Sequence, residues 1–172
     1  MQNVISLMSH ADHLKATVGA KNARAILANL GFCYSGDASA RQNTVFWHHS
    51  AGAAGKSLFF HAIGAKFFGS VKLALRWIAK ETNGQGQPVM PIVIECADHL
   101  KIDDADFKVL AERGGVHFLS NIVPKLPDAC ARRVVLVKWK TIERNPEYQI
   151  EGDEAAFIRL CCAEATKEIA FR

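Results

Sequence analysis

The stretch TVFWHHSAGAAGKSLFFHAIG, from Thr44 to Gly64, joins a β-branched and aromatic run to a helix-forming run through a loop of small and polar residues. The first run, over 44–49, predicts a short strand, because such side chains favour extended backbone. Downstream, apolar residues recur every three or four positions, which predicts one amphipathic helix over 56–81. Two glycines within that helix, Gly64 and Gly69, indicate either close packing against a neighbour or a break. The stretch therefore predicts strand, loop and helix, in that order.

The remainder of the chain continues to alternate strands with helices. Strands are predicted over 89–97, 116–123 and 132–142, and helices over 103–112 and 153–170. A parallel pair of strands needs a crossover of about a dozen residues or more, which these helices supply. We therefore expect an α/β fold, with a mostly parallel or mixed sheet of about four to five strands and helices on both faces. An α+β sheet, with an antiparallel pair near the last two strands, is the alternative.

Two helical runs precede the first strand. Ser9 resembles an N-cap, Gly19 interrupts the periodicity, and the second run continues to Leu30. A chain of 172 residues with 49% hydrophobic residues is long enough to bury one core. We expect a single globular domain over 1–172, in which residues 1–42 are an N-terminal helical extension packed on it.

Composition excludes several classes of protein. The N-terminal sequence MQNVISLMSHADHLK lacks the basic start and apolar run of a secretory signal, so we expect a cytoplasmic protein that has no membrane partner. The five cysteines have no CxxC spacing, which favours reduced packing residues. The net charge of +4, from 21 basic and 17 acidic residues, permits polyanionic partners without requiring them.

The segment SAGAAGKS matches most of the pattern G-x-x-x-x-G-K-[ST] between a strand and a helix, with Ser50 in place of the first glycine. Over about fifteen residues it resembles the phosphate-loop NTPases. The resemblance implies ATP or GTP with Mg²⁺ as cofactor, Lys56 at the terminal phosphates and Ser57 at the metal. The cofactor-binding residues that it implies are Ser50, Gly52, Gly55, Lys56 and Ser57. Alternatively, small residues open a buried helix here and Lys56 lies on its solvent side.

Acidic side chains follow the second predicted strand, where sites in open α/β sheets gather. Glu95 or Asp98 would orient metal or water, which makes Lys56, Glu95 and Asp98 the candidate catalytic residues and Ser57 with Glu95 the candidate metal ligands. Asp103, Asp104 and Asp106 extend this acidic group. They equally suit the first turn of a helix, whose dipole they would balance.

Histidines and basic residues suggest other sites. His48, His49 and His61 lie close in sequence and suggest metal binding or acid–base chemistry, although ordinary packing histidines have the same pattern. Basic residues interleaved with an aromatic residue can follow a nucleic-acid backbone and stack a base. The candidate nucleic-acid-binding residues are Lys72, Arg76, Lys80, Arg132, Arg133, Lys138 and Trp139. Such charges are also typical of solvated faces.

The N-terminal helical pair also resembles a helix-turn-helix, with Lys21, Asn22 and Arg24 on its second helix. Packing elements share this pattern.

Three functional hypotheses follow. The first is a small intracellular phosphate- or nucleotide-binding α/β protein. This hypothesis includes both simple binding of the ligand and hydrolysis of an NTP in concert with nucleic acid. The second is a non-catalytic regulatory or inhibitory module that binds nucleic acid or a protein partner through a basic face. The third is an oligomeric structural component without a small ligand.

Overall fold

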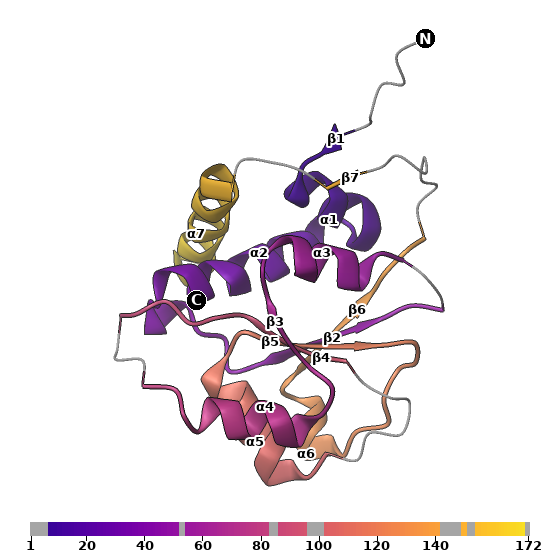
Figure 1. Cartoon of the computed structure of the whole chain (residues 1–172), viewed down its shortest axis with the longest axis vertical. Helices are drawn as coiled ribbons and strands as arrows, with labels where there is room; N and C mark the ends of the chain where they lie inside the picture. Colours follow the sequence, from indigo (N-terminus) through magenta and orange to yellow (C-terminus); the bar gives the residue numbers. More distant parts are fainter. Residues whose placement is uncertain are drawn as a thin grey trace.

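A five-stranded, all-parallel sheet forms the centre of the computed structural model, which describes residues 7–51, 54–82, 86–95, 102–141, 149–150 and 154–170 (Figure 1). Its strand order is β3-β4-β5-β2-β6. The strands are β2 (Val45–His49), β3 (Lys66–Phe68), β4 (Ile92–Glu95), β5 (Val116–Ser120) and β6 (Val134–Lys138). The predicted α/β fold is confirmed. The antiparallel alternative is wrong, because β5 and β6 each pair with β2 in parallel.

Helices cover both faces of this sheet (Figure 1). One face carries α1 (His10–Val18), α2 (Ala20–Ser35), α3 (Lys56–Ala62) and α7 (Glu154–Ala170). The other carries α4 (Val71–Ile78), α5 (Asp104–Arg113) and α6 (Asp128–Ala131). Alternation along each strand explains the two layers: Phe46 of β2 joins the first core, whereas Val45 and Trp47 join the second. A short 3₁₀ turn (Ala38–Ala40) follows α2, and β1 (Leu7–Met8) pairs in parallel with β7 (Gln149–Ile150).

The N-terminal helical pair belongs to the first layer. The Ser9 hydroxyl caps α1 by accepting from the Asp12 amide at 3.2 Å, and Gly19, at φ 82°, separates α1 from α2. Helix α2 is buried along most of its length and packs closely on α7. A Cβ added at Gly31 would overlap the carbonyl oxygen of Cys161, so the two helix backbones approach without an intervening side chain.

The single helix predicted over 56–81 is wrong. Gly64, at φ 73°, ends α3, and the amide of Lys66 then donates to the Pro91 carbonyl at 2.9 Å as β3 joins the sheet. Phe67 packs on one core and Phe68 on the other, the alternation typical of a strand with helices on both faces. Ser70 then caps α4 through the Leu73 amide at 3.2 Å. The break that the two glycines suggested is therefore real, and the four-residue spacing of apolar residues across it is coincidental.

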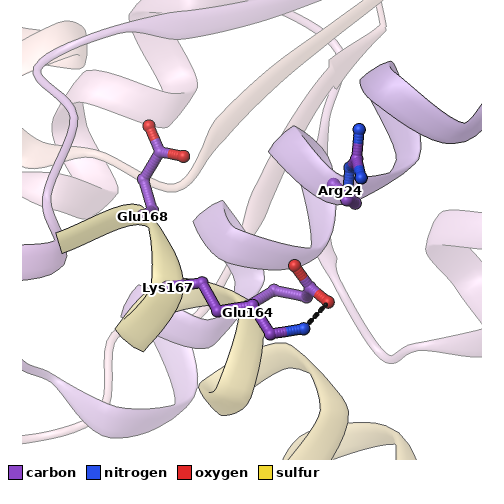
Figure 2. Close-up of a pocket in the computed structure, with 4 residues that line it drawn as sticks. All are labelled: Arg24, Glu164, Lys167 and Glu168. Atoms are coloured by element: carbon purple, nitrogen blue, oxygen red, sulfur yellow. Dashed lines mark hydrogen bonds and ion pairs between the residues drawn. The ribbon is translucent and has the colours of Figure 1, made fainter. Parts of the chain in front are cut away.

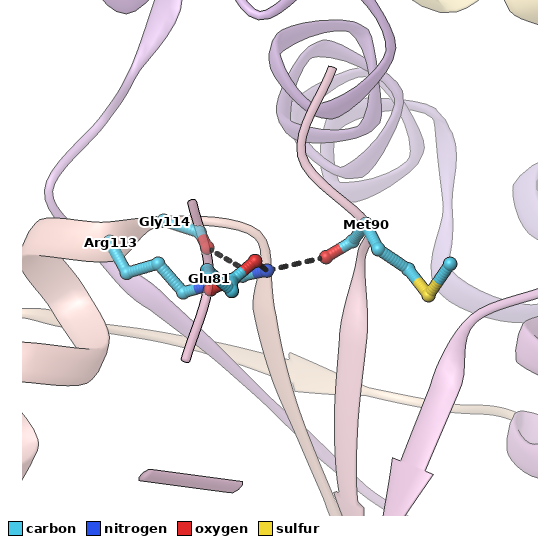
Figure 3. Close-up of polar contacts among 4 residues, drawn as sticks. All are labelled: Glu81, Met90, Arg113 and Gly114. Atoms are coloured by element: carbon cyan, nitrogen blue, oxygen red, sulfur yellow. Dashed lines mark hydrogen bonds and ion pairs between the residues drawn. The ribbon is translucent and has the colours of Figure 1, made fainter. Parts of the chain in front are cut away.

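A partly buried ion pair ties the second helical layer to the sheet (Figure 3). The Arg113 guanidinium, at the end of α5, donates to both carboxylate oxygens of Glu81 at 2.7 and 2.8 Å. It also donates to the carbonyls of Gly114 and Met90, each at 2.9 Å. The Trp77 ring lies beneath it, 5.7 Å from ring centroid to guanidinium carbon. These contacts join the end of α5 to α4, to the segment that follows α4 and to the segment that precedes β4.

The connections between strands create a topological switch point between β2 and β5, at the carboxyl end of the sheet. The chain leaves β2 through α3 on one face, whereas it leaves β3, β4 and β5 through α4, α5 and α6 on the other (Figure 1). Right-handed crossovers require this, because the first connection runs in the opposite direction along the sheet. β2 and β5 are neighbours whose chains depart to opposite faces, and ligands of open α/β sheets bind outside the carboxyl ends of such strands.

Candidate functional site

The loop between β2 and α3 lies at this carboxyl edge. Ala51, Ala54 and Gly55 are not helical, and α3 begins at Lys56. Gly55 adopts a left-handed conformation, φ 78° and ψ 18°, that residues with a Cβ rarely adopt. Gly52, which the resemblance assigns to cofactor binding, lies outside the described residues. The described part of the segment is therefore a loop ahead of a helix.

Lys56 is buried at the start of α3, with 8% of its surface exposed. Its Nζ donates to Oγ of Ser50, which is also buried. Burial lowers the pKa of Lys56, because an ammonium loses hydration there. Within the described ranges, no carboxylate forms an ion pair with this lysine. The alternative that placed Lys56 on the solvent side of the helix is wrong.

The two candidate metal ligands lie together. The Ser57 hydroxyl, in the first turn of α3, donates to Oε1 of Glu95 at 3.4 Å, and both side chains are exposed. Glu95 is the last residue of β4, so the fold brings together two positions 38 residues apart. Mg²⁺ prefers oxygen ligands and is held in many proteins by one or two protein groups plus phosphates and water, which this pair fits. No cluster of three or more His, Cys, Asp or Glu side chains occurs in the described part of the chain, and Asp98 lies outside it.

Trp139 does not lie on the surface. It is 2% exposed, and its indole N–H donates to Nδ1 of His48 at 2.9 Å. Nε2 of His48 in turn lies 3.0 Å from Nδ1 of His117, and both histidines are fully buried. The base-stacking role that the sequence suggested for Trp139 is incompatible with this burial.

The two basic groups lie at opposite edges of the sheet. Lys72, Arg76 and Lys80 are exposed on or just after α4, which contacts β3 and β4. Arg132 and Arg133 precede β6, the strand at the other edge, and Lys138 ends it. The structure therefore does not join them into one continuous basic face.

The other candidate groups mostly have structural roles. Asp103 caps α5 by accepting from the amides of Ala105 and Asp106 at 2.7 and 3.2 Å. His61 stacks on Phe67, with 3.8 Å between ring centroids, on the outside of α3. The burial of α2 leaves Lys21 and Arg24 near one end of a core helix, which does not suit insertion into a DNA groove.

Two surface hollows lie away from this loop. The first is lined by Arg24 of α2 and by Glu164, Lys167 and Glu168 of α7 (Figure 2). Lys167 and Glu164 already pair there at 3.0 Å. The second, near the amino ends of β2 and β6, is lined by Arg41, Asn43, Ala111, Glu112 and Arg133. Both combine charges of opposite sign, and neither includes a residue of the predicted phosphate site. The second includes Arg133 of the candidate nucleic-acid-binding residues.

Comparison with known proteins gives no family: no family model, curated protein or solved structure matches this chain. Across the described residues, none of the helices combines the length and the apolar character needed to cross a bilayer.

Proposed function

We propose that this protein binds a phosphate-bearing ligand, such as a nucleotide with Mg²⁺, at the loop between β2 and α3. The observation that carries the proposal is the buried ammonium of Lys56. Its hydrogen-bond partner, the Ser50 hydroxyl, is neutral. A buried cation without a counter-charge costs free energy, and a bound anion would offset that cost.

The surrounding residues suit this role. Lys56 would neutralise phosphate charge, and Gly55 lets the backbone turn sharply beside it. Ser57 and Glu95 would hold Mg²⁺, which when bound stabilises negative charge on phosphate oxygens. If the ligand is hydrolysed, Glu95 would orient the attacking water. Catalysis would then rest on positioning and electrostatics rather than on a covalent step.

The regulatory hypothesis based on a basic face has less support. Its two basic groups lie at opposite edges of the sheet, and its aromatic residue, Trp139, is buried. We therefore retain nucleic acid as a partner only if salt-dependent binding weakens when Lys72 and Arg76 are reversed in charge.

Isothermal titration calorimetry of the purified chain with ATP or GTP and Mg²⁺ tests the proposal. We expect saturable binding to the wild type and at least a tenfold loss, about 1.4 kcal/mol, in Lys56→Ala. Lys72→Ala, which removes an exposed charge elsewhere, is the control and should bind like the wild type. Equal binding heats in the wild type and Lys56→Ala, or no binding heat in either protein, would contradict the proposal. Circular dichroism of each variant separates lost binding from lost folding.

A further inference from the structure

A second pair of basic side chains lies beside the loop that carries Ser50. His49 is the last residue of β2, and its register partner on the parallel strand β6 is Lys138. Register partners on neighbouring strands project on the same side of the sheet, so the imidazole and the ammonium are neighbours. Lys138 is exposed and His49 is partly buried, and both are at the carboxyl edge.

Two lysines at this end of the sheet act on the same imidazole. The pKa of His49 is lowered, first by burial and then by the charges of Lys138 and Lys56. Lys138 belongs to β6 and Lys56 to α3, so positive charges from two separate elements act on His49. On its other side, β5 presents Ser120, whose uncharged hydroxyl accepts from the Trp47 indole at 2.8 Å. No carboxylate of the described residues offsets these charges at His49.

We propose that His49 and Lys138 form the second half of the anion site, so that its ligand is a linear polyphosphate rather than a single phosphate group. This inference rests on the proposed function. Lys56 would take one phosphate on the α3 side of Ser50. The remaining phosphates of a di- or triphosphate chain would extend toward β6, where Lys138 and a protonated His49 neutralise them.

Two consequences follow from electrostatics. First, affinity rises with chain length, because each added phosphate gains a cationic contact. Second, binding near pH 6.5 takes up protons, because the bound anion compensates the two lysine charges that disfavour protonated His49. His48, which precedes it, is fully buried and hydrogen-bonded, so it does not face the ligand.

Calorimetry with orthophosphate, pyrophosphate and tripolyphosphate, without metal at pH 6.5, tests the inference. We expect Lys138→Gln to weaken tripolyphosphate binding about tenfold and to change orthophosphate binding less than about twofold. Lys66→Gln removes the same charge from an exposed residue at the start of β3, and should match the wild type for all three anions. Repeating the titration in buffers of different ionisation enthalpy measures proton uptake. We expect that uptake to disappear in His49→Gln and to persist in His61→Gln, which removes an exposed histidine of α3.

The outcomes separate this inference from the proposed function. Loss of all binding in Lys56→Ala, together with wild-type behaviour of Lys138→Gln and His49→Gln, would support the phosphate site and overturn its extension to β6. Equal effects of Lys138→Gln and Lys66→Gln would also overturn the extension, because only net charge would then matter. Absence of binding to the wild type would overturn both.

Discussion

The indole N–H of Trp139 donates to Nδ1 of His48 at 2.9 Å, and this contact fixes the protonation of two buried imidazoles. Because an indole can only donate, Nδ1 of His48 carries no proton and the neutral ring keeps its proton on Nε2. That N–H donates to Nδ1 of His117 at 3.0 Å. The proton of His117 therefore lies on its own Nε2, which is buried and has no partner in the described structure.

Acid should destabilise this protein through the same two histidines. Burial lowers the pKa of His117 to about 3 and that of His48 well below its usual 6.5. Below pH 6.5 the unfolded chain binds protons that the folded chain does not, so this stability is complete above pH 6.5 and is lost as pH falls toward 3. Each histidine contributes a slope of up to about 1.4 kcal/mol per pH unit. Urea unfolding between pH 5 and 7 measures that slope.

His117→Asn isolates one histidine, because an asparagine carbonyl can accept from His48 but does not titrate. The dependence of the unfolding free energy on pH should therefore be weaker in the variant, by an amount that corresponds to close to one bound proton. His10 and His49, whose pKa values are also lowered, titrate in both proteins and cancel in the comparison. An unchanged slope would show that His117 is protonated in the folded state.

Arg113→Ala should lower the free energy of unfolding by about 2 kcal/mol, because it leaves the partly buried Glu81 carboxylate without its partner. Lys108→Ala breaks an exposed ion pair with Glu112 on the same helix, at 3.8 Å, and should cost less than about 1 kcal/mol. Chemical denaturation of both variants makes the comparison. Similar costs would mean that burial does not distinguish the two pairs.

Gly31→Ala should destabilise the protein by about 1–3 kcal/mol, although alanine is the better helix former by about 1 kcal/mol. The added methyl would overlap the Cys161 carbonyl and force α2 away from α7. Gly69→Ala, where a Cβ meets open space, is the matched control and should be close to neutral. Thermal unfolding shows whether Gly31→Ala lowers or raises the stability. A stabilised variant would show that the two helices do not touch.

Ser50→Ala should tighten anion binding up to about tenfold, because it removes the hydroxyl that competes for the Lys56 ammonium. The same change should lower the stability of the ligand-free protein, since the buried ammonium loses a partner. Tripolyphosphate titration together with urea unfolding measures both effects. Weaker binding without loss of stability would mean that Ser50 contacts the ligand directly.

Local sequence patterns sufficed for most of the fold. The β-branched runs at β2 and β6 and Gly114 after α5 mark their elements directly. The end of α2 was predicted wrongly, because the helix continues past Leu30 to Ser35 with Gly31 inside it. Local patterns also did not suffice for β3, whose three residues are too few to show an alternation and whose apolar spacing matches a helix. Its strand character comes from pairing with β4, a tertiary contact that local periodicity does not encode.

The positions of the candidate site residues were only partly predictable for a similar reason. The motif around Lys56 predicted a loop before a helix, and the carboxyl end of the next long strand predicted Glu95. The burial of Trp139 was not predictable from the sequence. Its basic sequence neighbours are typical of an exposed strand, and its partner His48 is 91 residues away in sequence. The pairing of His49 with Lys138 likewise required the strand order.

The most direct test is a proton–nitrogen correlation spectrum of the lysine ammonium groups during titration with tripolyphosphate. A buried ammonium exchanges its protons slowly with water, so Lys56 should give a resonance that is missing from Lys56→Gln. We expect that resonance to shift and saturate as the anion binds. A Lys56 resonance that stays in place while the anion binds elsewhere would contradict the assignment of this loop as the anion site.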